Sequence, residues 1–182
     1  MKKSIFFSLF IICCSLFTAC NFATPENYFD IAVLNCNMMH GFASDGLQYE
    51  LDNPSVKLVE GTKDQTAYMK RKEIIDNKTQ SLESNFKKIK SLKETDDAKA
   101  MLQASVALYE YVLPVYKNEY RQLARLYDEG ASKEQVEALE KSIEEKYYPT
   151  FETLFNKLTA EAKPYTAKNN IPVNWDVRTS PQ

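Results

Sequence analysis

A continuous stripe of apolar and aromatic side chains runs through residues 102–127. Steps of four and three residues, taken alternately, meet only such side chains, while charged residues such as Lys117 and Arg121 lie between them. That spacing is typical of one face of an α-helix, so it predicts a single long helix that ends at Gly130. The stripe consists of Leu102, Val106, Tyr109, Leu113, Tyr116, Tyr120, Leu123 and Tyr127.

Three other segments carry helical patterns. Residues 63–93 repeat an apolar side chain every seven positions, beginning at Tyr68. A later stripe follows a capping-box sequence at Ser132 and continues in steps of about 3.6 residues to Tyr165. Near the start of the chain, a threonine, a proline and an acidic residue form a helix-initiation signal, which predicts a helix over 25–40.

The stretch 42–61 interrupts these patterns. Turn signals at Asp45-Gly46 and at Asp52-Asn53-Pro54 bracket short runs of alternating apolar residues. One interpretation is a short β-hairpin over 47–59, and the other is an irregular excursion packed on the helices. Long connections of this kind often serve a function, so this stretch is a candidate contact surface.

The pattern therefore predicts an all-α fold. We expect an elongated up-and-down helical bundle of three long helices plus a shorter N-terminal helix over residues 25–168. All four glycines fall outside the expected helices, which supports this assignment. A polar tail over 169–182 follows, and we expect Trp175 to dock across the end of the bundle.

Two prolines lie near the middle of the long stripes. Pro114 and Pro149 lie at similar distances from the turn between the last two helices, so an antiparallel hairpin places both breaks at the same height. One interpretation is an aromatic-lined pocket where two kinked helices part, and the other is a bent bundle with tyrosines in its core. The residues of this candidate pocket or bend are Tyr109, Pro114, Tyr116, Tyr147, Pro149 and Phe151.

The sequence offers little catalytic or metal-binding chemistry. Cys36 and His40 would share a helix face, but His40 is the chain's single histidine, so a structural zinc or copper site lacks ligands. No glycine-rich phosphate loop is present, and the glutamates of the last helix, Glu140 among them, fit a solvated face. We therefore expect no enzyme activity, no metal and no cofactor.

The first residues carry the features of a signal peptide. Lys2 and Lys3 precede an apolar run that is too short to span a bilayer, and small residues lead up to Cys20. The sequence Leu16-Phe17-Thr18-Ala19-Cys20 resembles the lipobox of bacterial lipoproteins, although Phe17 stands where leucine is usual.

This resemblance implies a signal peptide over 1–19 and a lipidated Cys20 at the start of the mature chain. It also implies a cell-envelope location, and Asn21 at the second position favours the outer membrane facing the periplasm. With Cys20 acylated, we expect no intramolecular disulfide to Cys36. Residues 20–24 would then comprise the lipidated Cys20 and a short tether, residues 21–24, that spans at most about 14 Å before the first helix.

Charge completes the functional expectations. Removing Lys2 and Lys3 from the 23 basic residues leaves 21 against 25 acidic ones, a net charge of −4 that does not favour nucleic acid. We expect two partners, the membrane through the lipid and a protein. The first hypothesis is an accessory or adaptor subunit in the cell envelope. The alternative is a carrier that binds a small molecule or lipid between the proline-kinked helices.

Overall fold

The computed structural model describes residues 23–175 and is mostly helical, with one small two-stranded antiparallel sheet. The expected signal peptide, Cys20 and the last seven positions of the tail (176–182) lie outside the described residues. The strands are β1 (Val56–Leu58) and β2 (Thr66–Tyr68). The helical elements are α2 (Pro25–Ala32), the 3₁₀ helix η1 (Leu34–Met39), α3 (Asp45–Asp52), α4 (Arg71–Ser91), α5 (Lys99–Val115), the π-helical turn η2 (Tyr116–Tyr120), α6 (Arg121–Glu129) and α7 (Lys133–Lys168).

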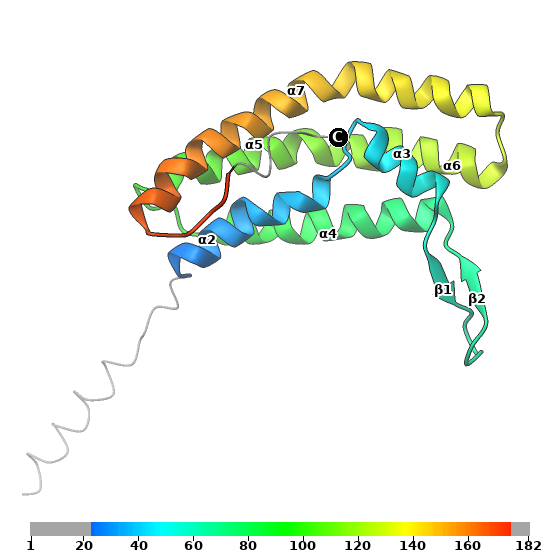
Figure 1. The fold of residues 1–182 in the computed structure, drawn as a ribbon, viewed down its shortest axis with the longest axis horizontal. Coiled ribbons are helices and arrows are strands. Elements are labelled where there is room, and N and C mark those ends of the chain that lie inside the picture. The colour runs from blue at the N-terminus through cyan, green and yellow to red at the C-terminus, as the bar shows by residue number, and fades with distance from the viewer. Residues whose placement is uncertain (1–22, 176–182) are drawn as a thin grey trace, which may run out of the picture.

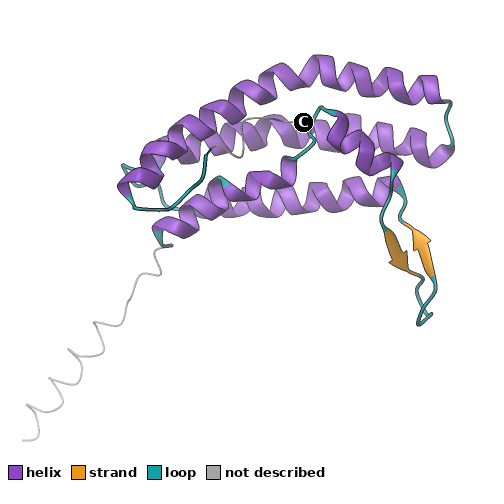
Figure 2. Cartoon of the chain, viewed as in Figure 1, coloured by secondary structure: helices purple, strands orange, loops and turns teal. Residues whose placement is uncertain are grey.

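The body of the protein is elongated along its helices (Figure 1). Helices α5, η2 and α6 follow one another as a central spine, with α7 packed along one side and α4 along another. The N-terminal elements α2 and η1 lie against α4, and α2 also reaches α5. The β1–β2 hairpin projects away from the helices near the start of α4 (Figure 2).

The predicted stripe of residues 102–127 forms much of the core. Six of its eight side chains are buried, and Val106 and Tyr127 are half-buried. The spine ends where expected, because Gly130 adopts a left-handed conformation with φ of 71° after the last helical residue. The predicted capping box is also confirmed, since the side chains of Ser132 and Gln135 each accept the other's backbone N–H.

The prediction of one helix over 25–40 is wrong. The α-helix stops at Ala32, and Cys36 donates its backbone N–H to Val33 instead of continuing the α-helical ladder. Side chains from other helices take the carbonyls that this break leaves: Asn85 Nδ2 donates to Ile31 at 2.9 Å and Ser105 Oγ donates to Ala32 at 2.7 Å. These long-range bonds stabilise a 3₁₀ turn that local pattern does not indicate.

The prediction of a helix over 63–93 is wrong at its start. Residues 66–68 form β2, and Tyr68, expected in the apolar stripe, is 72% exposed. The hairpin interpretation over 47–59 placed the strands wrongly, because β1 pairs with β2 in the register Val56↔Tyr68 and Leu58↔Thr66. A sheet does form, but its second strand lies outside the region expected for it.

Residues 45–52 are helical, so Gly46 does not lie outside the helices as expected. Leu47 and Leu51 belong to the alternating apolar run that suggests a strand, but they are also four residues apart and lie buried together on one face of α3. A Cβ on Gly46 would lie 2.9 Å from the Cα of Gly41, which has a positive φ of 78°. Two backbones meet closely here, and this contact needs glycine at both positions.

The segment before the undescribed end of the tail packs on the bundle. The ring of Trp175 meets Phe29 of α2 edge-on, with centroids 6.0 Å apart, and the ammonium of Lys163 lies 5.9 Å from the Trp175 ring. In the part of the chain from 23 to 175, no helix is both long and apolar enough to cross a membrane.

Candidate functional site

The two prolines of the candidate pocket lie on the outside of their helices. Pro114 and Pro149 are both exposed, and α7 continues through Pro149 without a break. On the spine, the π-helical turn begins two residues after Pro114. The spine therefore stays helical past Pro114, with one widened turn beside the proline.

Two of the six candidate residues join one packed aromatic cluster. The rings of Tyr116 and Phe151 both contact Phe42, with centroids 5.9 Å and 4.8 Å away, and Tyr120 packs on Tyr116 at 4.8 Å. The Tyr116 side chain is 0% exposed, and its hydroxyl has no hydrogen-bond partner among residues 23–175. Burial raises the pKa of this hydroxyl well above its ordinary value.

Tyr147 lies near the surface rather than in this cluster. Its hydroxyl donates to the carboxylate of Glu119 in η2, and its backbone carbonyl accepts from the Tyr111 hydroxyl at 3.1 Å. The Glu119 carboxylate is the main cause of the raised pKa of Tyr147. Both bonds connect α7 to the spine at the level of the prolines, so the helices are held together there.

Tyr109 faces the opposite side of the spine. Its hydroxyl accepts from Asn85 Nδ2 at 2.8 Å and donates to the backbone carbonyl of Asn35 at 3.4 Å, while its ring stacks on Phe86 at 5.8 Å. The Asn35 side chain donates to Asn85 Oδ1 at 2.7 Å. This buried network fixes η1 to α4 and α5, and desolvation raises the pKa of Tyr109.

Hydroxyl groups along the spine form hydrogen bonds with the N-terminal segment. From α5 to α6 they contact successively later residues of that segment, so the segment runs alongside the spine in the same direction. Sequence pattern places these tyrosines in the core but does not reveal this role. The bonds join Ser105 to Ala32, Tyr109 to Asn35, Tyr120 to the backbone N–H of Ala43 at 2.6 Å, and Tyr127 to Asp52 at 2.9 Å.

The last of these bonds lies at the root of the hairpin. Asp52 ends α3 just before β1, and Arg71 begins α4 just after β2. Asp128, next to Tyr127, accepts the backbone N–H groups of Arg71 and Lys72 at 2.9 Å and 3.0 Å and so caps α4 from another helix. Neighbouring residues of α6 therefore hold both ends of the segment that carries the hairpin.

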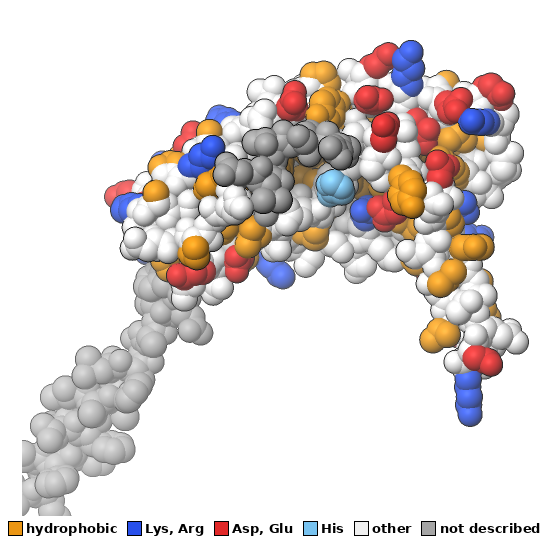
Figure 3. Space-filling model, viewed as in Figure 1, with side chains coloured by type: hydrophobic (Ala, Val, Ile, Leu, Met, Phe, Trp, Pro, Cys, Tyr) orange, Lys and Arg blue, Asp and Glu red, His pale blue; other side chains and the backbone are white. Residues whose placement is uncertain are grey.

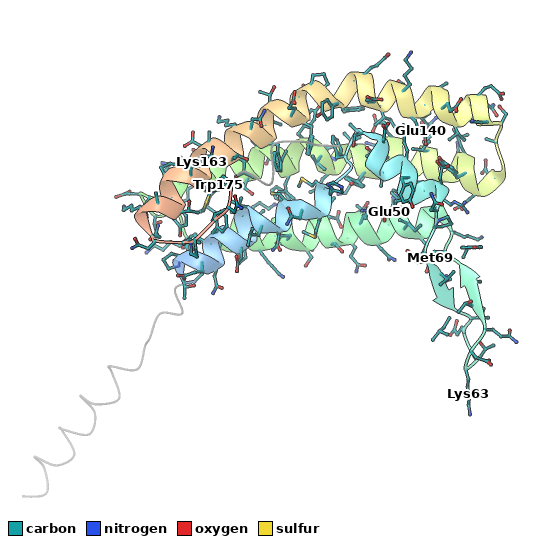
Figure 4. All side chains as sticks on the ribbon, in the orientation of Figure 1. Glu50, Lys63, Met69, Glu140, Lys163 and Trp175 are labelled. Carbon is teal, nitrogen blue, oxygen red and sulfur yellow. The ribbon has the colours of Figure 1, made fainter. Side chains whose placement is uncertain are left out.

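A buried carboxyl completes the root. Glu140 of α7, labelled in Figure 4, is only 8% exposed, and its Oε1 lies 2.8 Å from the Tyr127 hydroxyl. Desolvation, with the nearby charge of Asp52, raises the pKa of Glu140 although the Tyr127 hydrogen bond lowers it. The expectation of a solvated face is wrong here. The available signal was position, because Glu140 is four residues after buried Val136 and three before buried Ile143.

The hairpin carries an exposed apolar face. Val56 and Leu58 are 58% and 63% exposed, and their register partners Tyr68 and Thr66 lie on the same side of the sheet. We call these four residues the hairpin face. Figure 3 shows hydrophobic side chains along the hairpin and charged ones toward its end, where Figure 4 places Lys63.

A surface groove of about 850 Å³ lies between α4 and the η2–α6 part of the spine. It is rich in cations, but the structure pairs several of them with acidic residues. Arg121 and Lys72 both contact Asp76, and Lys117 contacts Glu83 at 2.6 Å. These pairs neutralise much of the positive charge, so the groove is a poor anion site.

Cys36 and His40 do not share a face. Because η1 is a 3₁₀ helix, the Cys36 thiol lies buried and donates to the Ala32 carbonyl at 3.4 Å, while His40 is exposed. Within residues 23–175 no group of histidine, cysteine, aspartate or glutamate side chains has the arrangement of a metal site.

Comparisons of the chain with protein-family models, with curated proteins and with solved structures find no match.

Proposed function

We propose that this protein is a membrane-anchored periplasmic lipoprotein that acts as an adaptor subunit in the cell envelope. The hairpin face is the observation that carries the proposal. Val56, Leu58 and Tyr68 are among five large hydrophobic side chains that stand exposed in residues 23–175. The other two, Val59 on the hairpin and Tyr49 on α3, lie close to them in the chain, and clustered exposed apolar residues are typical of interaction sites.

The composition of the hairpin favours a protein partner with an apolar surface. Its tip carries Glu60, Lys63 and Asp64, all exposed, whereas the apolar side chains line the strands. Entry of the tip into a bilayer would bring these charges into the hydrocarbon, so side-on docking of the hairpin face against a protein is favoured. A two-stranded sheet is also marginal alone in water and gains stability when a partner covers it.

The anchor and the hairpin suggest where the partner lies. Helix α2 begins at Pro25, a few residues after the cysteine that we expect to be lipidated, and in Figure 1 the hairpin points to the same side of the body as this start. With a tether of at most about 14 Å, a partner on the hairpin would be held near the membrane. The elongated up-and-down bundle would act as the rigid support between these two points.

The carrier alternative has weaker support. It relies on a space between the proline-kinked helices, and at that level Phe42, Tyr116 and Phe151 pack ring against ring. The bond from Tyr111 to Tyr147 also ties the two helices together there.

Site-specific photo-crosslinking in cells tests the adaptor proposal. A photoreactive amino acid at Leu58 or Tyr68 should capture one protein, whereas the same amino acid at Ala67, which points to the opposite side of the same hairpin, should not. A captured partner should also be lost in Leu58→Glu and kept in Gln65→Glu, because only Leu58 belongs to the hairpin face.

Two results would overturn the proposal. One is equal capture from Leu58 and Ala67, which would indicate non-specific proximity. The other is the absence of any protein adduct from the hairpin face while lipids or small molecules co-purify.

A further inference from the structure

The hairpin root holds fewer protons than its hydrogen bonds require. The Tyr127 hydroxyl lies 2.9 Å from Asp52 Oδ1 and 2.8 Å from Glu140 Oε1. A phenolic hydroxyl has one proton to donate, and an ionised carboxylate can only accept. Both contacts are full two-centre hydrogen bonds only when one of the two carboxyls carries a proton and donates it to the Tyr127 oxygen.

The surroundings select Glu140 as the protonated carboxyl. Glu140 is buried and Asp52 is exposed, so ionisation costs more at Glu140. The groups that face this site are mostly acidic, and they oppose a second negative charge. The acidic groups are Asp52 and Asp45 of α3 and Glu137 of α7 itself. The other charged groups at the root are Asp128 of α6, which caps α4, and the cation Arg71 of α4.

Arg71 does not neutralise the negative charge that an ionised Glu140 would carry. Its guanidinium carbon lies 5.8 Å from the centre of the Tyr127 ring, and its Nε donates to the Leu51 carbonyl at 3.0 Å. The cation is therefore engaged with the end of α3.

We propose that Asp52, Tyr127 and Glu140 form a proton-operated clasp at the hairpin root. With Glu140 protonated, Glu140 donates to Tyr127 and Tyr127 donates to Asp52, so α7, α6 and α3 are joined. With Glu140 ionised, two carboxylates compete for one hydroxyl proton, and the exposed Asp52 is released. Asp52 is the last residue of α3 before β1, so its release loosens the segment that leads into the hairpin.

The direction of the pH effect follows from the pKa of Glu140, which the fold raises above its ordinary 4.5. The Glu140 carboxyl binds its proton more tightly when the bonds of the clasp are formed than when they are broken. Its stabilisation is therefore fully present below about pH 4.5 and is lost as the pH rises through the raised pKa of Glu140. If the hairpin face docks a protein as proposed above, acidification would order the surface that the partner meets; the proton linkage itself does not depend on that function.

Hydrogen–deuterium exchange of the purified full-length protein tests the clasp. Peptides that cover residues 53–70 should lose protection as the pH is raised from about 4.5, the ordinary pKa of the carboxyl, through neutral, after correction for the intrinsic exchange rate. One linked proton changes the opening equilibrium by at most about tenfold per pH unit. Glu140→Gln, whose amide can donate to Tyr127 at any pH, should keep the protection constant over this range.

Two variants complete the test. Glu137→Gln removes the same charge one turn earlier on α7, where Glu137 is exposed and pairs with Lys133 at 3.4 Å. Because the Glu137 charge helps to raise the pKa of Glu140, this variant should keep the pH-dependent loss of protection and move it to lower pH. Tyr127→Phe should reduce the protection of residues 53–70 at low pH as well as at neutral pH. The clasp is refuted if Glu140→Gln retains the pH dependence of wild type, or if Glu137→Gln abolishes it equally. Failure of hairpin crosslinking in cells would instead count against the adaptor function alone.

Discussion

Replacing Tyr116 by phenylalanine should stabilise the protein, although the change removes a polar group from its centre. Tyr116 lies in η2, its side chain is 0% exposed, and its hydroxyl has no hydrogen-bond partner in the part of the chain that the structure describes. A buried hydroxyl that gives up its hydrogen bonds to water costs about 1–3 kcal/mol when nothing replaces them. The phenylalanine ring keeps the contacts with Phe42 and Tyr120 and removes only this cost.

The void left by the oxygen sets the opposing effect. A loss of roughly 10 Å³ at about 24 cal/mol per Å³ amounts to about 0.2 kcal/mol, which is much smaller than the cost of the buried hydroxyl. We therefore expect Tyr116→Phe to raise the free energy of unfolding by about 1 kcal/mol. For a chain of this size, that gain corresponds to an increase in Tm of about 2–4 °C.

Tyr120→Phe is the matched comparison, because it removes the same group from the same π-helical turn. The Tyr120 hydroxyl accepts the backbone N–H of Ala43 at 2.6 Å, so its loss leaves a buried donor unsatisfied and should cost about 1–3 kcal/mol. Urea unfolding of both variants, followed by circular dichroism, measures the two effects. A destabilised Tyr116→Phe would mean that a water molecule or another group satisfies the hydroxyl, and our reasoning would then be wrong.

Three further predictions concern other parts of the chain. Gly46→Ala should lower the free energy of unfolding by about 1–3 kcal/mol in urea titrations, because its Cβ would lie 2.9 Å from the Cα of Gly41; an unchanged midpoint would refute this close contact. Asp128→Ala should lower the free energy of unfolding by about 1 kcal/mol and reduce amide protection against hydrogen exchange at the start of α4. Protection unchanged from wild type at these amides would contradict the role of Asp128 as a cap. Cys20→Ala should move the protein from the membrane fraction to the soluble fraction on cell fractionation, and continued membrane association would disprove the lipid anchor.

Residues 102–127 and the final helix could be predicted because their patterns are long and local. Each stripe repeats over many turns, and each end has its own signal, Gly130 for the spine and Ser132 for α7. The exception within these helices is Glu140, which occupies a position that the periodicity assigns to the core although its side chain is polar. A buried carboxyl there depends on Tyr127, and a pattern within one helix cannot show that partner.

The N-terminal half was harder to predict because its structure depends on contacts between distant residues. Local pattern continues a helix past Val33, but bonds from Asn85 and Ser105 favour the break. Residues 66–68 have a β-branched and an aromatic side chain beside helix-forming neighbours, and pairing with β1 decides their conformation. The candidate pocket could not be resolved from sequence either, since proline spacing alone does not distinguish a cavity from packed rings.

The order of the hydroxyl bonds along the spine explains why a pH effect would be confined to the hairpin root. The hydroxyls of Ser105, Tyr109 and Tyr120 form hydrogen bonds with backbone groups. Burial raises the pKa of Tyr109 and Tyr120, so these hydroxyls stay uncharged near neutral pH and their bonds do not depend on pH there. Only the last hydroxyl, that of Tyr127, meets carboxyls. Loss of a proton there releases the end of α3 while the earlier bonds still hold the segment before it, so the hairpin can loosen without unfolding the body.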